Sequence, residues 1–351
     1  MQNINKLPYV SVIIPCRNEE KYIVECLESI LANDYPQDRL EILIIDGESE
    51  DATKAILEKY TQNYPFVKIF ENTKKITPAG LNIGIRNAKG EIIVRMDAHC
   101  TYDKRYISIC IEHLNEYNVD NVGGIWIILP RNDSLTAKAI VFALSDTFGA
   151  GNAYYKTVRT KERKWVDTVP FGCYRRSIFE RIGFFNESFP RNEDIELNNR
   201  IRKAGGRILL VPEIRVNYYA RTNYKEFVKH NFDNGVKITH PLKLNNMFFS
   251  FRHLIPFVFV TSLIGLFSLW MLSGSFFLDS LWSWLFLLIF GFYFLISLFV
   301  SCKITINKND PRYLILMPIM FFTLHFTYGL GSIWGVLKTV GSKRFWHNLW
   351  D

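Results

Sequence analysis

The chain has 351 residues, of which 48% are hydrophobic and 22% charged, and its formal net charge is +8. This length accommodates one domain of ordinary size together with a further part. No G-x-G-x-x-G follows the first predicted strand, which argues against a dinucleotide site, and the absence of G-x-x-x-x-G-K-[ST] excludes a P-loop. No basic helix or aromatic stacking platform accompanies the positive charge, so we expect no nucleic-acid partner.

The first hundred residues alternate between predicted strands and predicted helices. Apolar, β-branched runs predict four strands, at Tyr9–Ile14, Leu40–Ile45, Phe66–Phe70 and Glu91–Met96. Apolar residues at helical spacing predict helices between them, at Glu19–Leu31, Asp51–Tyr60 and Pro78–Ala88. This alternation is typical of an α/β fold with a mainly parallel sheet, and the nearly continuous apolar strands indicate burial on both faces.

Polar loops follow three of these strands. They begin at Pro15, at Asp46 and at Asp97. Because open α/β sheets bind ligands beyond the carboxyl ends of their strands, we expect these loops to form one site. In extended chain, residues i and i+2 point to the same side, so Asp97 and His99 can both face one metal ion. The alternative is that Asp97 caps the next turn and His99 is an ordinary surface residue.

The middle of the chain contains a second group of polar residues that could form a site. The segment Pro170–Arg176 has the composition of a turn packed close to a ligand, and Arg191–Glu196 precedes a helix predicted at Leu197–Ala204, with Gly205 as its C-terminal cap. Glu193 and Asp194 have an alternative interpretation, because acidic residues are favoured in the first turn of any helix.

The last third of the chain is apolar and predicts a membrane domain at 254–337. Leu254–Ser273 and Leu281–Val300 each match the ~20 residues that cross a bilayer. Tyr313–Leu337 is as long but contains Pro318 and three glycines. A third crossing would also place the basic tail 338–351 outside, against the positive-inside rule. We therefore predict two spans and a third segment that is re-entrant or interfacial, with His325 as an interhelical hydrogen-bonding residue.

Basic residues precede the first span and predict an amphipathic membrane-interface segment at 222–253, in contact with anionic headgroups. The six cysteines form no C-x-x-C pair, which suits a reducing compartment. Met1–Lys6 is polar, and no signal peptide is expected. We predict a multi-pass protein of the cell membrane whose first part is cytoplasmic. Whether a second copy of the chain is a partner is left open.

Four ordered motifs resemble family 2 glycosyltransferases of GT-A fold. They are VSVIIPCRNEE, IIDGESED, PAGLNIGIRNAKGEIIVRMDAH and GCYRRSIFERIGFFNESFPRNEDIELNNRIRKAGGRI. The form D-A-H and the trailing hydrophobic segments look most like ExoA-type membrane enzymes of exopolysaccharide assembly. The resemblance implies a GT-A domain at 1–221, with a nucleotide-sugar-binding half at 1–118 and an acceptor-binding half at 119–221.

The resemblance also implies roles for individual residues. Asp97 and His99 would hold Mn²⁺ or Mg²⁺, although His99 stands where the family usually has Asp and could instead bind the diphosphate. Asp194 would be the general base for an acceptor hydroxyl, and Glu193 would orient the acceptor or Asp194. The residues implied to bind the nucleotide sugar are Pro15, Arg17, Glu19, Asp46, Lys75, Asn82 and Asp97.

The activity implied is an inverting, metal-dependent transfer of one sugar, from a nucleotide sugar such as a UDP-hexose to a hydroxyl of a polyprenyl-diphosphate-linked glycan. A polyprenyl-phosphate sugar synthase is the alternative, but a phosphate acceptor needs no general base. A processive synthase is disfavoured because His230–Gly235 lacks the family's Gln and Arg. A nucleotide-binding scaffold and a transporter are also considered, but the acidic residues are present and no repeat is found.

Overall fold

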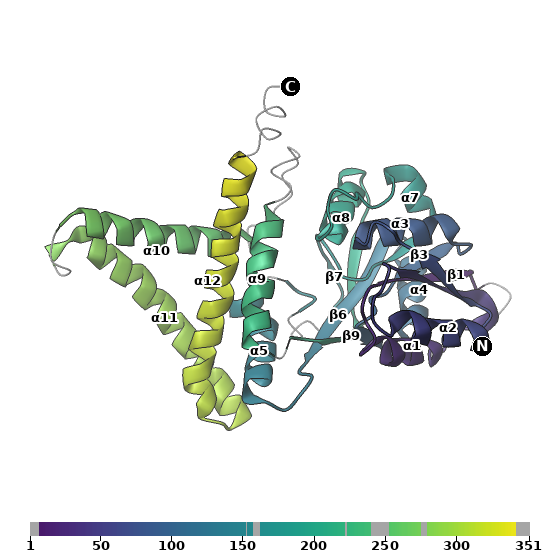
Figure 1. Ribbon diagram of the computed structural model, residues 1–351, viewed down its shortest axis with the longest axis horizontal. Coiled ribbons are helices and arrows are strands. Elements are labelled where there is room, and N and C mark those ends of the chain that lie inside the picture. The colour runs from purple at the N-terminus through teal and green to yellow at the C-terminus, as the bar shows by residue number, and fades with distance from the viewer. Residues whose placement is uncertain are drawn as a thin grey trace. The chain divides into compact units, whose positions relative to one another are not determined.

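The structure is a computed structural model that describes residues 7–151, 153–156, 162–221, 223–239, 253–274 and 279–341. The chain forms two compact units (Figure 1). The first comprises Met1–Ile127 and Tyr154–Tyr219, and the second comprises Ile128–Ala153 and Ala220–Asp351. A segment from the middle of the chain thus joins the C-terminal helices, whereas the sequence analysis predicted one continuous domain at 1–221.

The first half of unit 1 has the predicted alternation of strands and helices. Its elements are β1 (Val10–Cys16), α1 (Ile23–Leu31), β2 (Leu40–Asp46), α2 (Thr53–Asn63), β3 (Val67–Glu71), α3 (Thr77–Asn87) and β4 (Ile92–Arg95), with a 3₁₀ turn, η2 (Gln37–Arg39), before β2. Strands β3, β2, β1 and β4 pair side by side in parallel. The loops after β1, β2 and β4 therefore lie at one edge of the sheet, as expected.

The second half of the unit extends this sheet with antiparallel pairs. Its elements are β5 (Cys100–Tyr102), α4 (Tyr106–Glu116), β6 (Asn121–Leu129), β7 (Lys164–Trp165), β8 (Cys173–Arg175), α7 (Ser177–Ile182), α8 (Glu193–Lys203) and β9 (Ile208–Tyr219). The strand order is β3-β2-β1-β4-β8-β6-β9-β5, with β7 paired to β9. The sheet is mixed, not mainly parallel, because β8 pairs antiparallel with β4 and with β6, and β5 and β7 pair antiparallel with β9.

The sheet is buried on both faces, as the apolar strands predicted. Alternate residues of β1 point to opposite sides. Val12 packs in one core with α1 and α4, and Ile13 packs in the other with α3 and α8. The helix predicted from Leu197 begins earlier, at Glu193, so that prediction was wrong by four residues. Three carboxylates in the first turn favour the earlier start.

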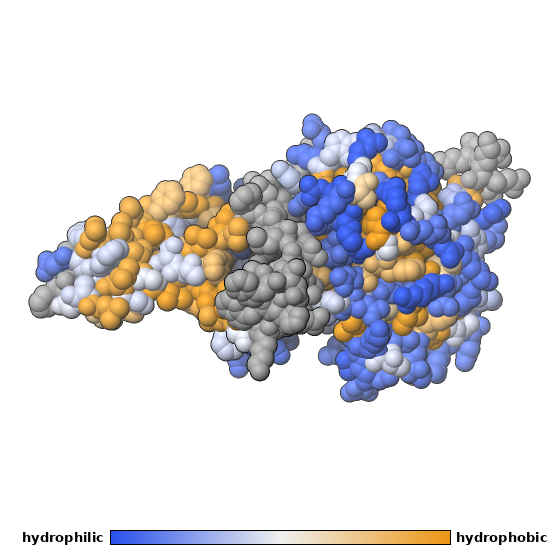
Figure 2. All heavy atoms as spheres, turned by 90° about the horizontal axis from the view of Figure 1, so that it is seen from above, coloured by the Kyte–Doolittle hydropathy of each residue, from blue (hydrophilic) through white to orange (hydrophobic). Residues whose placement is uncertain are grey.

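Unit 2 contains helices of two kinds. α5 (Leu135–Ser145), α6 (Thr147–Ala150) and α9 (Tyr224–Ile238) are short, whereas α10 (Leu254–Leu272), α11 (Leu281–Lys308) and α12 (Arg312–Val340) are long and apolar enough to cross a membrane. Figure 2 shows a largely apolar surface over the end of this unit formed by α10 and α11. Within the described residues, these three helices indicate membrane association.

α12 is one unbroken helix that runs through Pro318 and through the glycines behind it. A re-entrant turn inside this segment, one of the two predicted arrangements, is therefore wrong. The glycines do not break the helix because neighbouring backbones pack against them: an added Cβ on Gly331 would collide with the carbonyl of Phe232. The predicted tail at 338–351 lies largely outside the described residues.

Candidate active site

The loops after β1 and β2 are locked together at the carboxyl edge of the sheet. The Asn18 backbone N–H donates to Ser49 Oγ (2.9 Å), and the Glu50 N–H donates to Asn18 Oδ1 (2.8 Å). Asp46 at the end of β2 is buried, and it accepts hydrogen bonds from the backbone N–H (3.1 Å) and the hydroxyl (2.5 Å) of Ser49. Asn18 and Glu48 both have positive φ, so the loops turn sharply at these positions.

The D-A-H motif follows β4 and turns at once into β5. Tyr102, buried in β5, holds the backbone of Asp97 on both sides: the Asp97 N–H donates to the Tyr102 hydroxyl (2.6 Å), and that hydroxyl lies 3.2 Å from the Asp97 carbonyl. The Asp97 side chain is 19% exposed and the His99 side chain 32%. The Asp97 carboxylate and the His99 imidazole are therefore both accessible from one loop whose backbone is fixed.

His99 contacts Glu19 from the loop after β1, with 3.2 Å between Nδ1 and Oε1. The Tyr218 ring lies edge-on against the imidazole, with 5.9 Å between ring centroids. A carboxylate on one ring nitrogen leaves the other nitrogen available as a ligand, which is the usual arrangement of metal-binding histidines. The donor set, one carboxylate oxygen and one imidazole nitrogen, suits Mn²⁺. No group of three or more metal-ligating side chains occurs within the described residues.

Glu193 and Asp194 form the first turn of α8. Glu193 is 5% exposed, and its Oε1 lies 2.8 Å from Arg95 Nη2. Asp194 is half-buried, and its Oδ1 accepts the backbone N–H of Ile195 at 2.8 Å. Glu193 is thus held by an internal partner, whereas Asp194 has the more accessible carboxylate of the two. This difference fits Asp194 as the group that meets an acceptor.

Arg95 joins the D-A-H motif to the acidic pair, and it was not among the site residues predicted from the sequence. Its Nη2 bonds Glu193, and its Nε lies 3.3 Å from Asp97 Oδ1, while only 7% of its side chain is exposed. The guanidinium also lies 5.7 Å from the ring centroid of Phe171. The sequence contains one indication of a partner for Arg95. It is the single charged residue, at the end, of an otherwise apolar buried strand, where an unpaired charge would be costly.

Burial and the neighbouring charges change the proton affinities of this cluster. Burial raises the pKa of Glu193 to about 7, and the Arg95 guanidinium opposes the rise. Burial likewise raises the pKa of Asp194, and Arg95 and the Ile195 N–H oppose that rise. A carboxylate whose pKa is raised toward neutrality is a stronger base than a solvent-exposed one, so both groups suit proton abstraction from a hydroxyl.

The other predicted nucleotide-binding residues have partners of their own. Lys75 forms an ion pair with Glu48, with 2.5 Å between Nζ and Oε2. Arg17 forms a solvent-exposed ion pair with Glu50, with 3.3 Å between Nη2 and Oε1. Asn82 is buried, donates to the Phe185 carbonyl and Glu187 Oε1, and accepts the Phe185 N–H. Asn82 therefore holds the 185–187 loop, and a contact with nucleotide would require it to exchange these bonds. Pro15 lies within β1 and packs beside Gly80 of α3.

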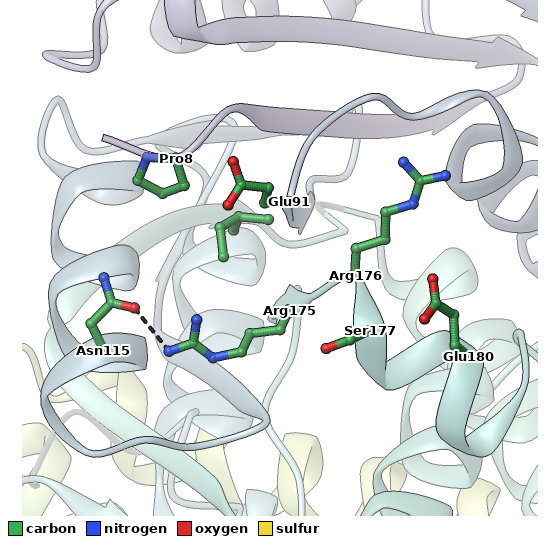
Figure 3. Close-up of a pocket in the computed structure, with 8 residues that line it drawn as sticks. Pro8, Glu91, Asn115, Arg175, Arg176, Ser177 and Glu180 are labelled. Carbon is green, nitrogen blue, oxygen red and sulfur yellow. Dashed lines mark hydrogen bonds between the residues drawn. The ribbon is translucent and has the colours of Figure 1, made fainter. Parts of the chain in front are cut away.

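A cavity of about 490 Å³ lies at the opposite edge of the sheet (Figure 3). Its wall includes Pro8, before β1, and Glu91, before β4, so it faces the amino ends of the parallel strands. The Arg175 guanidinium donates to Asn115 Oδ1 at 2.8 Å and is occupied there. None of the predicted site residues lines this cavity, which is therefore separate from the candidate active site.

Comparison with known proteins agrees with this geometry. The model of a family described as Glycosyl transferase family 2 matches residues 11–183. Glycosyltransferase AglE of Haloferax volcanii is 33% identical over 230 residues, which are 65% of this chain and 72% of that protein. A second relative, from Methanococcus voltae, is 29% identical over 345 residues, 96% of this chain and 99% of that protein. Its name is dolichyl N-acetyl-alpha-D-glucosaminyl phosphate 3-beta-D-2,3-diacetamido-2,3-dideoxy-beta-D-glucuronosyltransferase.

A solved structure shows the same fold. The mannosyltransferase PcManGT from Pyrobaculum calidifontis, in complex with GDP-Man and Mn²⁺, aligns with a TM-score of 0.63 at 18% identity, over 96% of this chain and 89% of that one. The fold and the edge-of-sheet site define a GT-A glycosyltransferase that acts on nucleotide sugars in glycan biosynthesis. The chain belongs to glycosyl transferase family 2.

Proposed function

We propose that this enzyme transfers a single sugar from a nucleoside diphosphate sugar to a hydroxyl of a lipid-linked glycan, with inversion, at the cytoplasmic face of a cell membrane. The observation that carries the proposal is the Arg95 bridge, because it joins a metal-ligand motif to an acidic pair through two short contacts. Donor activation and acceptor deprotonation must occur at adjacent positions in a direct displacement. The bridge supports that adjacency.

The donor side is built from the loops at the carboxyl ends of β1, β2 and β4. Asp97 and His99 would hold a divalent cation, and Glu19 would keep the imidazole in the tautomer that ligates. When bound, the cation would neutralise charge that develops on the departing diphosphate. Asp46 would meet the ribose or base of the nucleotide, and Lys75 would meet the diphosphate. A UDP-hexose is the donor we favour.

The acceptor side is the first turn of α8. Asp194 would accept the proton of the acceptor hydroxyl as its oxygen attacks the anomeric carbon from the side opposite the diphosphate. This single displacement inverts the anomeric configuration. Glu193, fixed on Arg95, would keep the turn and its neighbouring carboxylate in position.

The acceptor is proposed to be lipid-linked for two reasons. The Methanococcus voltae relative is named for a dolichyl sugar phosphate and aligns along almost the whole of this chain. The apolar helices of unit 2 are also suited to keep an enzyme at a membrane, where such an acceptor resides. A bare polyprenyl phosphate is the second candidate acceptor. The Glu193–Asp194 pair disfavours it, because a phosphate is already ionised at neutral pH.

The experiment is a transfer assay with the purified full-length protein in lipid vesicles. Radiolabelled UDP-sugars and GDP-sugars are offered with Mn²⁺, in parallel with a polyprenyl-linked sugar and with bare polyprenyl phosphate. We expect label on the sugar-bearing lipid and a large loss in Asp194→Asn. Label on bare polyprenyl phosphate alone, at a rate that Asp194→Asn does not alter, would establish the synthase activity instead.

A further inference from the structure

The three long apolar helices of unit 2 differ in how their side chains are covered. In α10 and in α11, 11% of the most apolar 18-residue window is buried within the structure, whereas in α12 the share is 44%. Exposed apolar residues of α10, such as Ile255, Val258 and Phe267, are spread around the helix. A helix that is apolar on all sides and uncovered needs lipid around it. α10 and α11 have this property, and α12 does not.

Most of the exposed large apolar residues of α12 fall on one side of the helix, with Leu314 as the exception. Ile315, Ile319, Trp334 and Leu337 are each at least 48% exposed. At 3.6 residues per turn these positions share a stripe about 100° wide. The glycines Gly331 and Gly335 lie outside this stripe and meet α9. A helix that exposes one apolar stripe and is covered by protein on the opposite side has only that stripe available for contact with lipid.

α9 runs beside the second half of α12 in the same direction (Figure 1). The Tyr224 hydroxyl lies 2.9 Å from Thr323 Oγ1 at one end, and a Cβ on Gly335 would collide with Thr239 and Val236 at the other. Gly235 and Gly331 bring the two backbones into direct contact between these ends. The two helices therefore share one depth relative to any bilayer.

α9 is too polar for the hydrocarbon core. Its exposed side chains include Lys225, Glu226 and Lys229. Charges facing lipid at membrane depth are costly and rare. If α9 stays at the headgroups, so does the half of α12 that it covers. The part that α9 does not cover, residues 312–322, is about 16 Å long as a helix, against the ~30 Å of a hydrocarbon core.

The first half of α12 is also covered by protein. Phe142 of α5 packs edge-on against Tyr313, with 5.2 Å between ring centroids, and Phe148 of α6 packs against Phe321 at 5.0 Å. Lys138 of α5 forms an ion pair with Asp133, which precedes the helix. Protein thus accompanies α12 along both halves.

We propose that α12 lies along the lipid headgroups together with α9 and does not cross the bilayer, and that among the described helices α10 and α11 are the pair that crosses, as a hairpin. The partner of the α12 stripe is the membrane surface itself, with Lys225 and Lys229 near anionic headgroups. The lengths of these two helices suit a crossing of the hydrocarbon core, because α10 is about 28 Å long and α11 about 42 Å at 1.5 Å per residue. This arrangement does not depend on the sugar transfer proposed above.

Single cysteines test the arrangement without assuming which side is cytoplasmic. Five native cysteines are buried, and Cys302→Ser removes the sixth, which is partly exposed. Asp279→Cys marks the α10–α11 turn, Asn307→Cys the last turn of α11 and Gly341→Cys the residue after α12; all three positions are exposed. Intact cells are treated with a membrane-impermeant maleimide, and the remaining thiols are counted after lysis.

We expect Gly341→Cys to behave as Asn307→Cys does and opposite to Asp279→Cys. If Gly341→Cys groups with Asp279→Cys, α12 crosses the membrane and the proposal is wrong. If all three sites behave alike, α10 and α11 do not form a crossing hairpin, and the proposal is equally wrong.

Depth measurements provide a second test. Nitroxides at Ile315, Phe326 and Leu337 stand at intervals of 11 residues, about 16 Å along the helix, and one at Phe292 of α11 gives a reference inside the bilayer. We expect the three α12 labels to share one shallow depth. A crossing helix would instead place the Phe326 label deepest, near the depth of the Phe292 label.

Discussion

Replacing Arg95 with methionine removes the guanidinium that joins the two halves of the site while keeping an unbranched side chain of similar length. Glu193 then loses its partner at 2.8 Å, and Asp97 loses the contact at 3.3 Å. Because the Arg95 and Glu193 side chains are each only 7% exposed, water cannot replace the lost contact. Leaving one member of a buried ion pair unpaired costs ~3–5 kcal/mol.

Glu193 can reduce part of that cost by taking up a proton, since burial already raises its pKa to about 7. We therefore expect Arg95→Met to lose about 2–4 kcal/mol of stability at neutral pH, toward the lower part of the range for a broken buried pair. The loss should shrink at lower pH, where the unpaired Glu193 is protonated. The double variant Arg95→Met/Glu193→Gln should recover part of the stability, because it leaves no buried charge unpaired.

Activity should not recover with stability. Arg95→Met frees Asp97 and the α8 turn to move, and misplacement of about 1 Å can cost a reaction ~10²-fold. The assay is kcat and the donor KM of purified protein, normalised to the folded fraction, beside the unfolding midpoint in detergent. We expect kcat to fall ~10²-fold or more in both the single and the double variant.

Arg200→Met is the matched control, because Arg200 also forms an ion pair with a buried carboxylate, Glu196, at 2.7 Å, and holds the carbonyls of the 182–184 turn. It should lose stability while the folded fraction keeps its kcat. The reasoning about Arg95 is refuted if Arg95→Met retains the wild-type kcat and donor KM, or if Arg200→Met loses kcat to the same degree.

Three further predictions concern the proposed chemistry. Asp194→Asn should lower kcat by ~10²–10⁴, the usual contribution of a positioned base, with donor KM little changed; near-normal turnover removes Asp194 as the base. Because a base must be ionised and burial raises the pKa of Asp194, kcat should rise with pH through a midpoint above that of a solvent-exposed aspartate, and a midpoint at or below that of a free aspartate contradicts this. Activity should vanish with EDTA and return with Mn²⁺ or Mg²⁺. His99→Asp should shift the preference toward Mg²⁺, which favours carboxylate oxygen, and full activity in excess chelator would exclude the metal.

Much of the fold was predictable from apolar periodicity. The strands β1 to β4 and the helices between them lie close to where the sequence placed them, because each strand is a mostly apolar run bounded by polar turns. The antiparallel half of the sheet was harder to predict from the sequence, since β5, β7 and β8 have only two or three residues each and show no apolar periodicity. α8 begins directly after Asn192, which takes a left-handed conformation that sequence spacing does not reveal.

The residues of the candidate site and the edge of the sheet where they lie were predictable from the sequence, but the contacts between them were not. The loops expected to meet at one edge do meet there, and Glu19 contacts His99. Glu19 was expected to contact the nucleotide, not the imidazole of His99. Arg95 escaped notice because a single charge in an apolar strand has no local signature of its role: its partner Asp97 is two residues away, but its other partner, Glu193, lies far along the chain. Such bridges depend on tertiary packing.

The most direct test of the central claim is the structure of the product. The lipid-linked product of a preparative reaction is delipidated and examined by mass spectrometry and proton NMR, which identify the new bond and its anomeric configuration. The account predicts one added sugar, joined through a glycosidic bond to a hydroxyl of the acceptor sugar, with configuration opposite to that of the donor. A sugar esterified directly to the lipid phosphate, or one that retains the donor configuration, would contradict it.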